Sequence, residues 1–416
     1  MLQTKRLFIC FAVLYLHSYF CVSEHRNFKK EWKFHRKALF RYGRHIASEA
    51  NSFLFAVCSE DKLPREMNCN VTIDTPILPW NVSNTHRQTC HLKLVGSEKG
   101  EVKHEITGIS SLDRLTRNRA IMVWWERRQD SQFKIQNIIV SVINMAKCTT
   151  IHLSFPIEEH GMILLGNVVI YSNSFDVTIS NIAICKNTPT CRITYDVEGK
   201  QIGYPAPFIP IFTSVHTEPV AALSPNKGFY ACGVDSRSWR FKAMHVSPTG
   251  HGVNLMRVTV SDPTKIHYAV SNAHELYGIC LMDQKRAFCA QLDASANVKM
   301  NATMRIPGHA QDAHWIGVHN LKDGGILLLT GKCSGYKCRK FRIIRVLDNG
   351  EEEKEVDQEL NIKCSNVPDQ LSVEVAEYEN DFCFYFACSH TLNTDGKIKS
   401  SVKLVSKCVT KSDLMA

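Results

Sequence analysis

The sequence contains none of the short motifs that mark the common nucleotide-binding and hydrolytic enzymes. It has no Walker loop and no GxGxxG turn, which excludes the usual phosphate-binding signatures. HExxH and GxSxG are also absent, so neither the common zinc metalloprotease helix nor a nucleophile elbow is encoded. Because no catalytic constellation is marked, we expect a binding protein without a cofactor rather than an enzyme.

The chain also has few segments that could separate domains. It contains 14 prolines among 416 residues, and no Pro-rich or Ser/Gly-rich stretch divides it. Apart from residues 7–20, no run is apolar over the length that a membrane span needs. The missing linker favours one large domain over two or three ordinary ones.

Seven short apolar phrases, each typical of a buried strand, recur along the chain. They start about 55 residues apart on average, which is the length of a four-stranded propeller blade with uneven loops. The phrases are FLFAVC from Phe53, AIMVWWE from Ala120, VVIY from Val168, FYACGV from Phe229, YGICLM from Tyr277, ILLLTG from Ile326 and FCFYFAC from Phe382. We interpret them as equivalent inner strands. The sequence therefore predicts an all-β fold, a single β-propeller of seven four-stranded blades within residues 46–410.

Two alternatives stay open at this point. The long intervals after Phe53 and Val168 allow six or eight blades, and tandem β-sandwiches are the alternative architecture. The chain has no G-H…W-D pair, no paired glycines of the kelch type and no Asp box. A single return strand follows the last phrase, so we expect residues 34–42 to supply the missing outer strand and close the ring.

Residues 1–23 have the organisation of a secretory signal. A positively charged start precedes an apolar run over residues 7–20, and small residues precede a cut before Glu24. The pattern predicts a secreted, extracellular protein with no membrane span after cleavage, and an uncleaved N-terminal anchor is the alternative. Residues 24–45 then form a basic leader, and residues 411–416 a C-terminal tail.

The cysteine content suits the oxidising secretory route. The chain has 17 cysteines, and 15 remain once Cys10 and Cys21 leave with the signal. Short hairpin turns place two pairs directly opposite each other, at the spacing a disulfide needs, and three further pairs are close in sequence. The opposed pairs are Cys280 with Cys289 and Cys383 with Cys408, and the local pairs are Cys185 with Cys191, Cys333 with Cys338, and Cys58 with Cys69. Small buried strand residues are the alternative interpretation.

The odd cysteine number leaves at least one thiol, which either stays reduced or bridges to another molecule. Three N-x-S/T sequons, at Asn70, Asn81 and Asn301, are glycan acceptors if they are exposed in the secretory route. Together these features predict a disulfide-bonded glycoprotein.

Positive charge is concentrated in the leader. The formal net charge is +10, from 50 Lys and Arg against 40 Asp and Glu. Basic and aromatic side chains alternate in EHRNFKKEWKFHRKALFRYGRH, a composition that suits sulfated polysaccharides outside the cell, where no nucleic acid is expected. The candidate polyanion-binding residues are Lys29, Lys30, Lys33, Arg36, Lys37 and Arg41. Alternatively, the aromatic residues pack on the first and last blades.

Two further clusters contain side chains that could bind a metal ion or a carbohydrate. GHAQDAHW brings His309, Asp312 and His314 close in sequence, and nitrogen and carboxylate donors together suit a transition metal. The alternative, which we favour, is that they are polar loop residues hydrogen-bonded to the backbone. In WWERR, Trp124 and Trp125 face opposite sides of a strand, and Glu126 with its arginines either forms a carbohydrate-binding edge or a solvated strand end.

As a whole the chain resembles cysteine-rich proteins secreted in insect venom and saliva. The resemblance is carried by the signal MLQTKRLFICFAVLYLHSYFCVS, the scattered hairpin cysteines and the missing housekeeping motifs. It implies an effector that binds host molecules. We therefore expect a monomeric secreted propeller that binds an extracellular protein or glycan, with a secreted propeller hydrolase, its site at the channel mouth, as the alternative.

Overall fold

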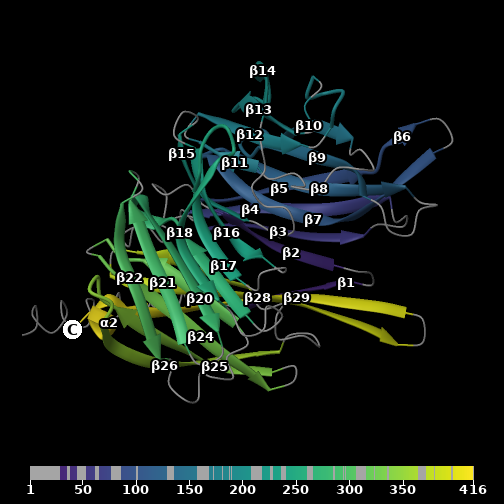
Figure 1. The fold of residues 1–416 in the computed structure, drawn as a ribbon. Coiled ribbons are helices and arrows are strands. Elements are labelled where there is room, and N and C mark those ends of the chain that lie inside the picture. Colours follow the sequence, from purple (N-terminus) through teal and green to yellow (C-terminus); the bar gives the residue numbers. More distant parts are fainter. Residues whose placement is uncertain are drawn as a thin grey trace, which may run out of the picture.

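Nearly all of the described chain is β-strand, arranged as a ring of small sheets (Figure 1). The computed structural model describes residues 29–34, 38–44, 53–60, 65–75, 86–99, 102–128, 135–156, 168–179, 181–186, 188, 190–207, 218–224, 228–235, 240–259, 266–283, 286–305, 315–334, 337–363, 372–394 and 397–415, except for single positions inside these ranges. Among these residues, no helix has the length and apolar composition needed to cross a bilayer.

The strands form seven antiparallel blades of four consecutive strands, with one exchange at the end. Blades 1 and 2 are β2(Ala38–Arg44), β3(Phe53–Glu60), β4(Glu66–Thr75), β5(His86–Val95), and β7(Val102–Thr116), β8(Arg119–Arg128), β9(Ile135–Asn144), β10(Thr149–Pro156). Blades 3 and 4 are β11(Val168–Ile170), β12(Ser174–Ile179), β13(Cys191–Asp196), β14(Gln201–Pro207), and β15(Glu218–Ser224), β16(Gly228–Asp235), β17(Arg240–Val246), β18(Gly252–Thr259).

Blades 5 and 6 are β19(Ile266–Ser271), β20(Leu276–Asp283), β21(Arg286–Asp293), β22(Val298–Arg305), and β23(Trp315–Asn320), β24(Ile326–Ser334), β25(Lys337–Val346), β26(Glu352–Lys363). Blade 7 consists of β27(Ser372–Glu377), β28(Asp381–Thr394), β29(Lys397–Thr410) and β1(Lys29–Phe34). The short strand β6(Glu98–Lys99) pairs with β7, the 3-10 turn η1(Ala273–Glu275) joins β19 to β20, and the short helix α2(Lys411–Met415) follows β29. The fold is a seven-bladed β-propeller.

Seven separate apolar cores hold the ring together, and each lies between two adjacent blades. In β28, Phe382, Phe384 and Phe386 pack against blade 6, whereas Cys383 and Tyr385 pack toward blade 1. Successive strand residues point to opposite faces, so a strand buried on both faces needs an unbroken apolar sequence. This requirement is the physical origin of the seven apolar phrases.

Six of the seven phrases are the second strand of a blade rather than the innermost one. VVIY is the exception: Val168–Ile170 forms β11, the first strand of blade 3. The second strand of that blade is β12, whose sequence SFDVTI is fully buried although it carries Asp176. The buried carboxylate of Asp176 interrupts the apolar pattern of β12, so the apolar phrase of this blade lies in the neighbouring strand β11.

The N-terminal strand closes the ring, because β1 pairs antiparallel with β29 from Lys29 opposite Val405 to Phe34 opposite Ser400. Figure 1 shows β1 beside β29. The sequence placed the exchanged strand at residues 34–42, whereas β2 at Ala38–Arg44 instead pairs with β3 in blade 1. Trp32 and Phe34 are half-buried and pack on the core between blades 7 and 1.

Disulfides join neighbouring strands within blades and, in one case, two blades. Both pairs predicted from hairpin geometry are disulfide-bonded, Cys280 with Cys289 and Cys383 with Cys408, as are two of the pairs predicted from closeness in sequence, Cys58 with Cys69 and Cys185 with Cys191. A further disulfide, which the sequence did not predict, joins Cys90 to Cys148. The last bond connects β5 of blade 1 to the β9–β10 turn of blade 2.

The remaining cysteines of the prediction are only partly described. Cys333 lies opposite Cys338 in the β24–β25 ladder, and Cys338 takes part in a disulfide. Cys388 in β28 also takes part in a disulfide. Cys232 in β16 is a reduced thiol that is fully buried between blades 4 and 5, so it is not positioned to bridge to another molecule.

Candidate functional site

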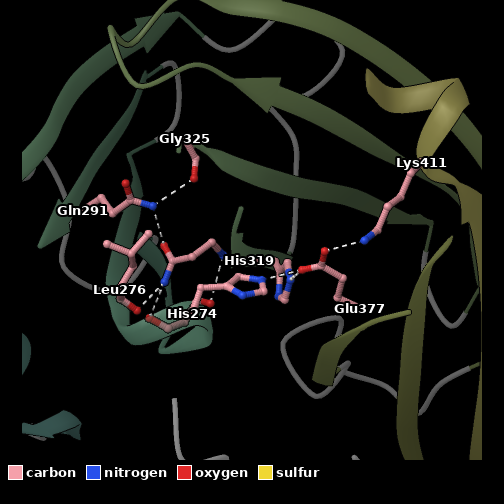
Figure 2. A network of polar contacts seen from close by, with 9 residues as sticks. His274, Leu276, Gln291, His319, Gly325, Glu377 and Lys411 are labelled. Carbon is pink, nitrogen blue, oxygen red and sulfur yellow. Dashed lines mark hydrogen bonds and ion pairs between the residues drawn. The ribbon is translucent and has the colours of Figure 1, made fainter. Parts of the chain in front are cut away.

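Three consecutive blades bring two histidines and a carboxylate together at one end of the ring. His274 lies in η1 of blade 5, His319 near the end of β23 in blade 6, and Glu377 at the end of β27 in blade 7. Figure 2 shows the three side chains pointing toward one another, with Lys411 on the far side of Glu377. The three are widely separated in sequence, and the equivalent placement of first strands around the ring makes them neighbours.

The contacts centre on one carboxylate. Oε2 of Glu377 lies 2.5 Å from Nε2 of His274 and 3.5 Å from Nε2 of His319. Oε1 of Glu377 accepts a hydrogen bond of 2.5 Å from Nζ of Lys411. The Lys411 ammonium group lies over the Phe382 ring, 5.3 Å from its centre, and the His319 imidazole makes a T-shaped contact with the same ring. Each carboxylate oxygen therefore has a different role, one facing imidazoles and one facing an ammonium group.

The electrostatics of this cluster favour an ionised carboxylate. Burial acts to raise the pKa of Glu377, but hydrogen bonds from His274, His319 and Lys411 outweigh burial and hold that pKa well below its usual value. Burial lowers the pKa of His319, and the neighbouring Glu377 opposes this shift only in part. The cluster therefore places a carboxylate anion next to an imidazole whose neutral form is favoured.

A strained turn presents His274 to the cluster. His274 and Glu275 have φ values of 58° and 59°, in the left-handed region that non-glycine residues rarely adopt. Two such residues in succession cost of order 1–3 kcal/mol each and persist only where the surrounding contacts impose them. Here the imposed conformation directs the His274 imidazole at Glu377 rather than at its sequence neighbour Glu275.

A buried amide beside the cluster fixes η1 and β23 relative to each other. Nδ2 of Asn320 donates to the backbone oxygens of Ser271 and Leu276, at 3.1 and 2.6 Å, which are the residues on either side of η1. Its Oδ1 accepts from Nε2 of Gln291, which also donates to Gly325. The packing is so close that a Cβ on Gly278 would lie 2.3 Å from Oδ1 of Asn320. Asn320 therefore holds the turn that carries His274.

A second feature is an exposed surface on blade 3, which we call the blade-3 surface and define by Ile182, Lys186, Ile202 and Tyr204. Tyr204 is 83% exposed on the outermost strand β14, and Ile202, two residues earlier on that strand, is 50% exposed. Ile182, 53% exposed, and Lys186 lie in the turn after β12, and Nζ of Lys186 is 4.2 Å from the centre of the Tyr204 ring. This contact brings the turn against the outer strand.

The residues that the sequence singled out for metal and polyanion binding are only partly described. His309, Asp312 and His314 lie outside the described residues, as do Arg36 and Lys37. Lys29 and Lys30 lie in β1 and Arg41 in β2, and the Lys33 side chain in β1 is exposed. The half-buried Trp32 packs against Phe55 of blade 1, with ring centres 6.1 Å apart, so it contributes to the core between blades.

The sequons differ in accessibility. Asn301 is exposed on the outermost strand of blade 5, and Asn70 is half-exposed on β4 with its Oδ1 2.6 Å from Nδ1 of His91. Asn81 lies outside the described residues. Attachment of a glycan at any of them stays a prediction.

The WWERR segment is part of the ring's framework. Trp124 packs in the core between blades 1 and 2, and Trp125 in the core between blades 2 and 3. Glu126 is 1% exposed and accepts hydrogen bonds from the backbone and side chain of Ser97 and from Asn137. The inward direction of Glu126 removes the carbohydrate-binding edge that the sequence left as an interpretation.

The sequence signal for the His274, His319 and Glu377 cluster was almost nil. In the sequence, His274 and its neighbour Glu275 form an isolated histidine–acid pair, and neither His319 nor Glu377 belongs to a motif. The only relation that the sequence offers is one of position: His319 is the next-to-last residue of the first strand of blade 6, and Glu377 is the last residue of the first strand of blade 7.

No protein-family model and no curated protein matches the chain. Among solved structures it is similar to the Dos1 propeller, at 13% identity and a TM-score of 0.44, with 91% of this chain and 95% of the other covered. It is similar to AofleA from Arthrobotrys oligospora at 9% identity and a TM-score of 0.39, with 80% and 90% covered. It is also similar to prolyl oligopeptidase B from Galerina marginata at 10% identity and a TM-score of 0.43, with 84% of this chain and 47% of the other covered.

At such identities and scores, these comparisons add nothing to the fold assignment, which depends on the strand topology of the chain itself.

Proposed function

We propose that this chain is a secreted propeller that binds an extracellular protein through the blade-3 surface. The observation that carries the proposal is the exposure of Tyr204, together with Ile182 and Ile202, on the outside of a ring whose other large apolar side chains are mostly packed between blades. Tyrosine combined with aliphatic side chains and a cation is typical of the residues that dominate protein interfaces.

The disulfides support the extracellular location. Five described bonds, four within blades and one between blades, suit an oxidising compartment. The signal-like residues 1–23 point to the same route. The resemblance to venom and salivary proteins extends the proposal to an effector role toward host molecules.

Charge favours an acidic protein as the partner. Lys186 lies over the Tyr204 ring, and the chain as a whole has a formal net charge of +10. A net positive charge raises the association rate with an acidic partner, and the rate falls as salt is added. A glycan partner would instead use hydrogen-bonding side chains around the aromatic ring, and the apolar Ile182 and Ile202 do not supply these.

The experiment compares the full chain, produced through the secretory route, with Tyr204→Ala on an array of purified extracellular proteins and glycans. We expect binding to one or more acidic proteins, with affinity reduced at least tenfold by Tyr204→Ala. The control is Val253→Ser, which changes a 63% exposed valine on the outermost strand of blade 4 and is expected to leave binding unchanged. The proposal fails if the chain is retained in the cell, if only glycans bind, or if Tyr204→Ala binds as well as the control.

A further inference from the structure

We propose that His274, His319 and Glu377 form a binding site for a divalent transition-metal ion of the zinc class. Their nearest donor atoms, two imidazole nitrogens and one carboxylate oxygen, all lie within 4.8 Å of one another. Two histidines with one carboxylate are a ligand set that zinc uses in proteins, with a fourth position left for water or another ligand. The site is independent of the blade-3 surface, since it lies on blades 5 to 7.

The separations are close to those of a bound ion. Zinc–ligand distances of about 2.0–2.1 Å in a tetrahedron place neighbouring donor atoms roughly 3.3 Å apart. The Oε2 atom of Glu377 is already 3.5 Å from Nε2 of His319, so this pair needs almost no movement. The 2.5 Å separation from Nε2 of His274 must widen by somewhat less than 1 Å, which the His274 side chain can supply because it is 21% exposed.

The surroundings orient the ligands as a metal site requires. Lys411 holds Oε1 of Glu377, which leaves Oε2 directed at both imidazoles. Such outer contacts fix the direction of a ligating carboxylate. The same ammonium charge repels a cation, so we expect weaker binding than at structural zinc sites that have no nearby positive charge.

The chemistry of the donors decides the class of ion. Imidazole nitrogen suits zinc and its neighbours among the transition metals, whereas magnesium and calcium prefer oxygen ligands. Each Nε2 that hydrogen-bonds the Glu377 carboxylate carries a proton, so an ion can bind there only when the ring proton is carried on Nδ1 instead. A neutral imidazole reaches this state by moving its proton from Nε2 to Nδ1 with no net release, whereas a doubly protonated imidazole releases one proton to the solvent. His274 and Lys411 are partly exposed, with side chains 21% and 26% exposed, so the cluster meets solvent at these two residues.

The test uses the full chain, stripped with a chelator, dialysed and titrated with Co²⁺ and then with Zn²⁺. We expect one saturable visible absorption band of tetrahedral or five-coordinate Co²⁺ per chain, displaced by Zn²⁺ and unaffected by excess Mg²⁺. His274→Ala and Glu377→Gln should each weaken the affinity at least tenfold. The matched control is His251→Ala, which removes an exposed histidine in the β17–β18 turn and should leave the titration unchanged.

Folding of each variant is checked by far-UV circular dichroism before titration. Should Glu377→Gln not fold, His274→Ala decides alone, because its side chain is partly exposed and its removal opens no internal cavity. Absence of a saturable Co²⁺ band in the wild type overturns the proposal. Equal affinity in His274→Ala and His251→Ala overturns it as well, because the three side chains are then only an internal hydrogen-bonded cluster.

Discussion

Asn320 offers the sharpest test of how blades 5 and 6 are joined. Asn320→Ala removes three hydrogen bonds, those to the backbone oxygens of Ser271 and Leu276 and the one from Gln291. Asn320 is 0% exposed, so water does not replace these contacts. At about 1 kcal/mol for each bond, the free energy of unfolding should fall by about 3 kcal/mol.

The expected change in melting temperature follows from the size of the domain. An unfolding entropy of about 2 cal/mol/K per residue over some 390 residues gives a fall in Tm of about 4 °C for this loss. Differential scanning calorimetry measures it, with Asn349→Ala in an exposed turn as the control, expected within 1 °C of the wild type. If Asn320→Ala has the same Tm as Asn349→Ala, the amide of Asn320 does not hold the turn that carries His274, and the reasoning is refuted.

Two further predictions concern the disulfides and a buried acid. Replacing Cys90 and Cys148 by alanine removes a disulfide with a sequence separation of 58, and the free energy of unfolding should fall by about 4 kcal/mol. Replacing Cys185 and Cys191, which are separated by 6, should lower it by about 2 kcal/mol, because a shorter loop restricts the unfolded chain less. Urea unfolding measures both losses, and equal losses would contradict the loop-entropy argument. Burial raises the pKa of Glu374 in β27 from its ordinary 4.5 to about 8. The stability of the folded protein is therefore complete with respect to this group below pH 4.5 and falls as pH rises toward 8, because over that range the unfolded chain releases the proton and the folded chain keeps it. Between pH 4.5 and 8, the free energy of unfolding should fall by about 2 kcal/mol more in the wild type than in Glu374→Gln, as measured by denaturant unfolding at each pH. This is roughly half of what the full pKa shift implies, because the side chain keeps some contact with solvent. Parallel pH profiles of the two proteins would contradict a raised pKa.

The architecture could be predicted from the sequence because each second strand is buried on both faces. Phe382 to Cys388 and Ile326 to Leu329 must be apolar at every position to fill two cores, and this requirement produces a signal that needs no homologue. The hairpin disulfides follow from local geometry in the same way, since opposed strand residues have a fixed spacing. The disulfide between Cys90 and Cys148 could not be predicted in this way, because the proximity of these two cysteines depends on how two blades pack.

The cluster of His274, His319 and Glu377 could not be predicted for the same physical reason. Its members come from three blades, and no local spacing relates a turn in one blade to the strand ends of the next two. The placement of the closing strand was similarly ambiguous, because both β1 and β2 alternate basic with apolar residues, and only their partners β29 and β3 distinguish them.

Blade 7 is assembled from opposite ends of the polypeptide, and this arrangement orders the events of biosynthesis. Strand β1, which carries Trp32 and Phe34, leaves the ribosome before the other strands. Its partner β29 is translated after all the other strands. The six blades in between can therefore form during translation, but the circle is completed only afterwards. Until that moment Trp32 and Phe34 can pack only against blade 1, through contacts such as that of Trp32 with Phe55, and the blade 7 side of their core is missing. This stage is therefore the one most in need of chaperone protection.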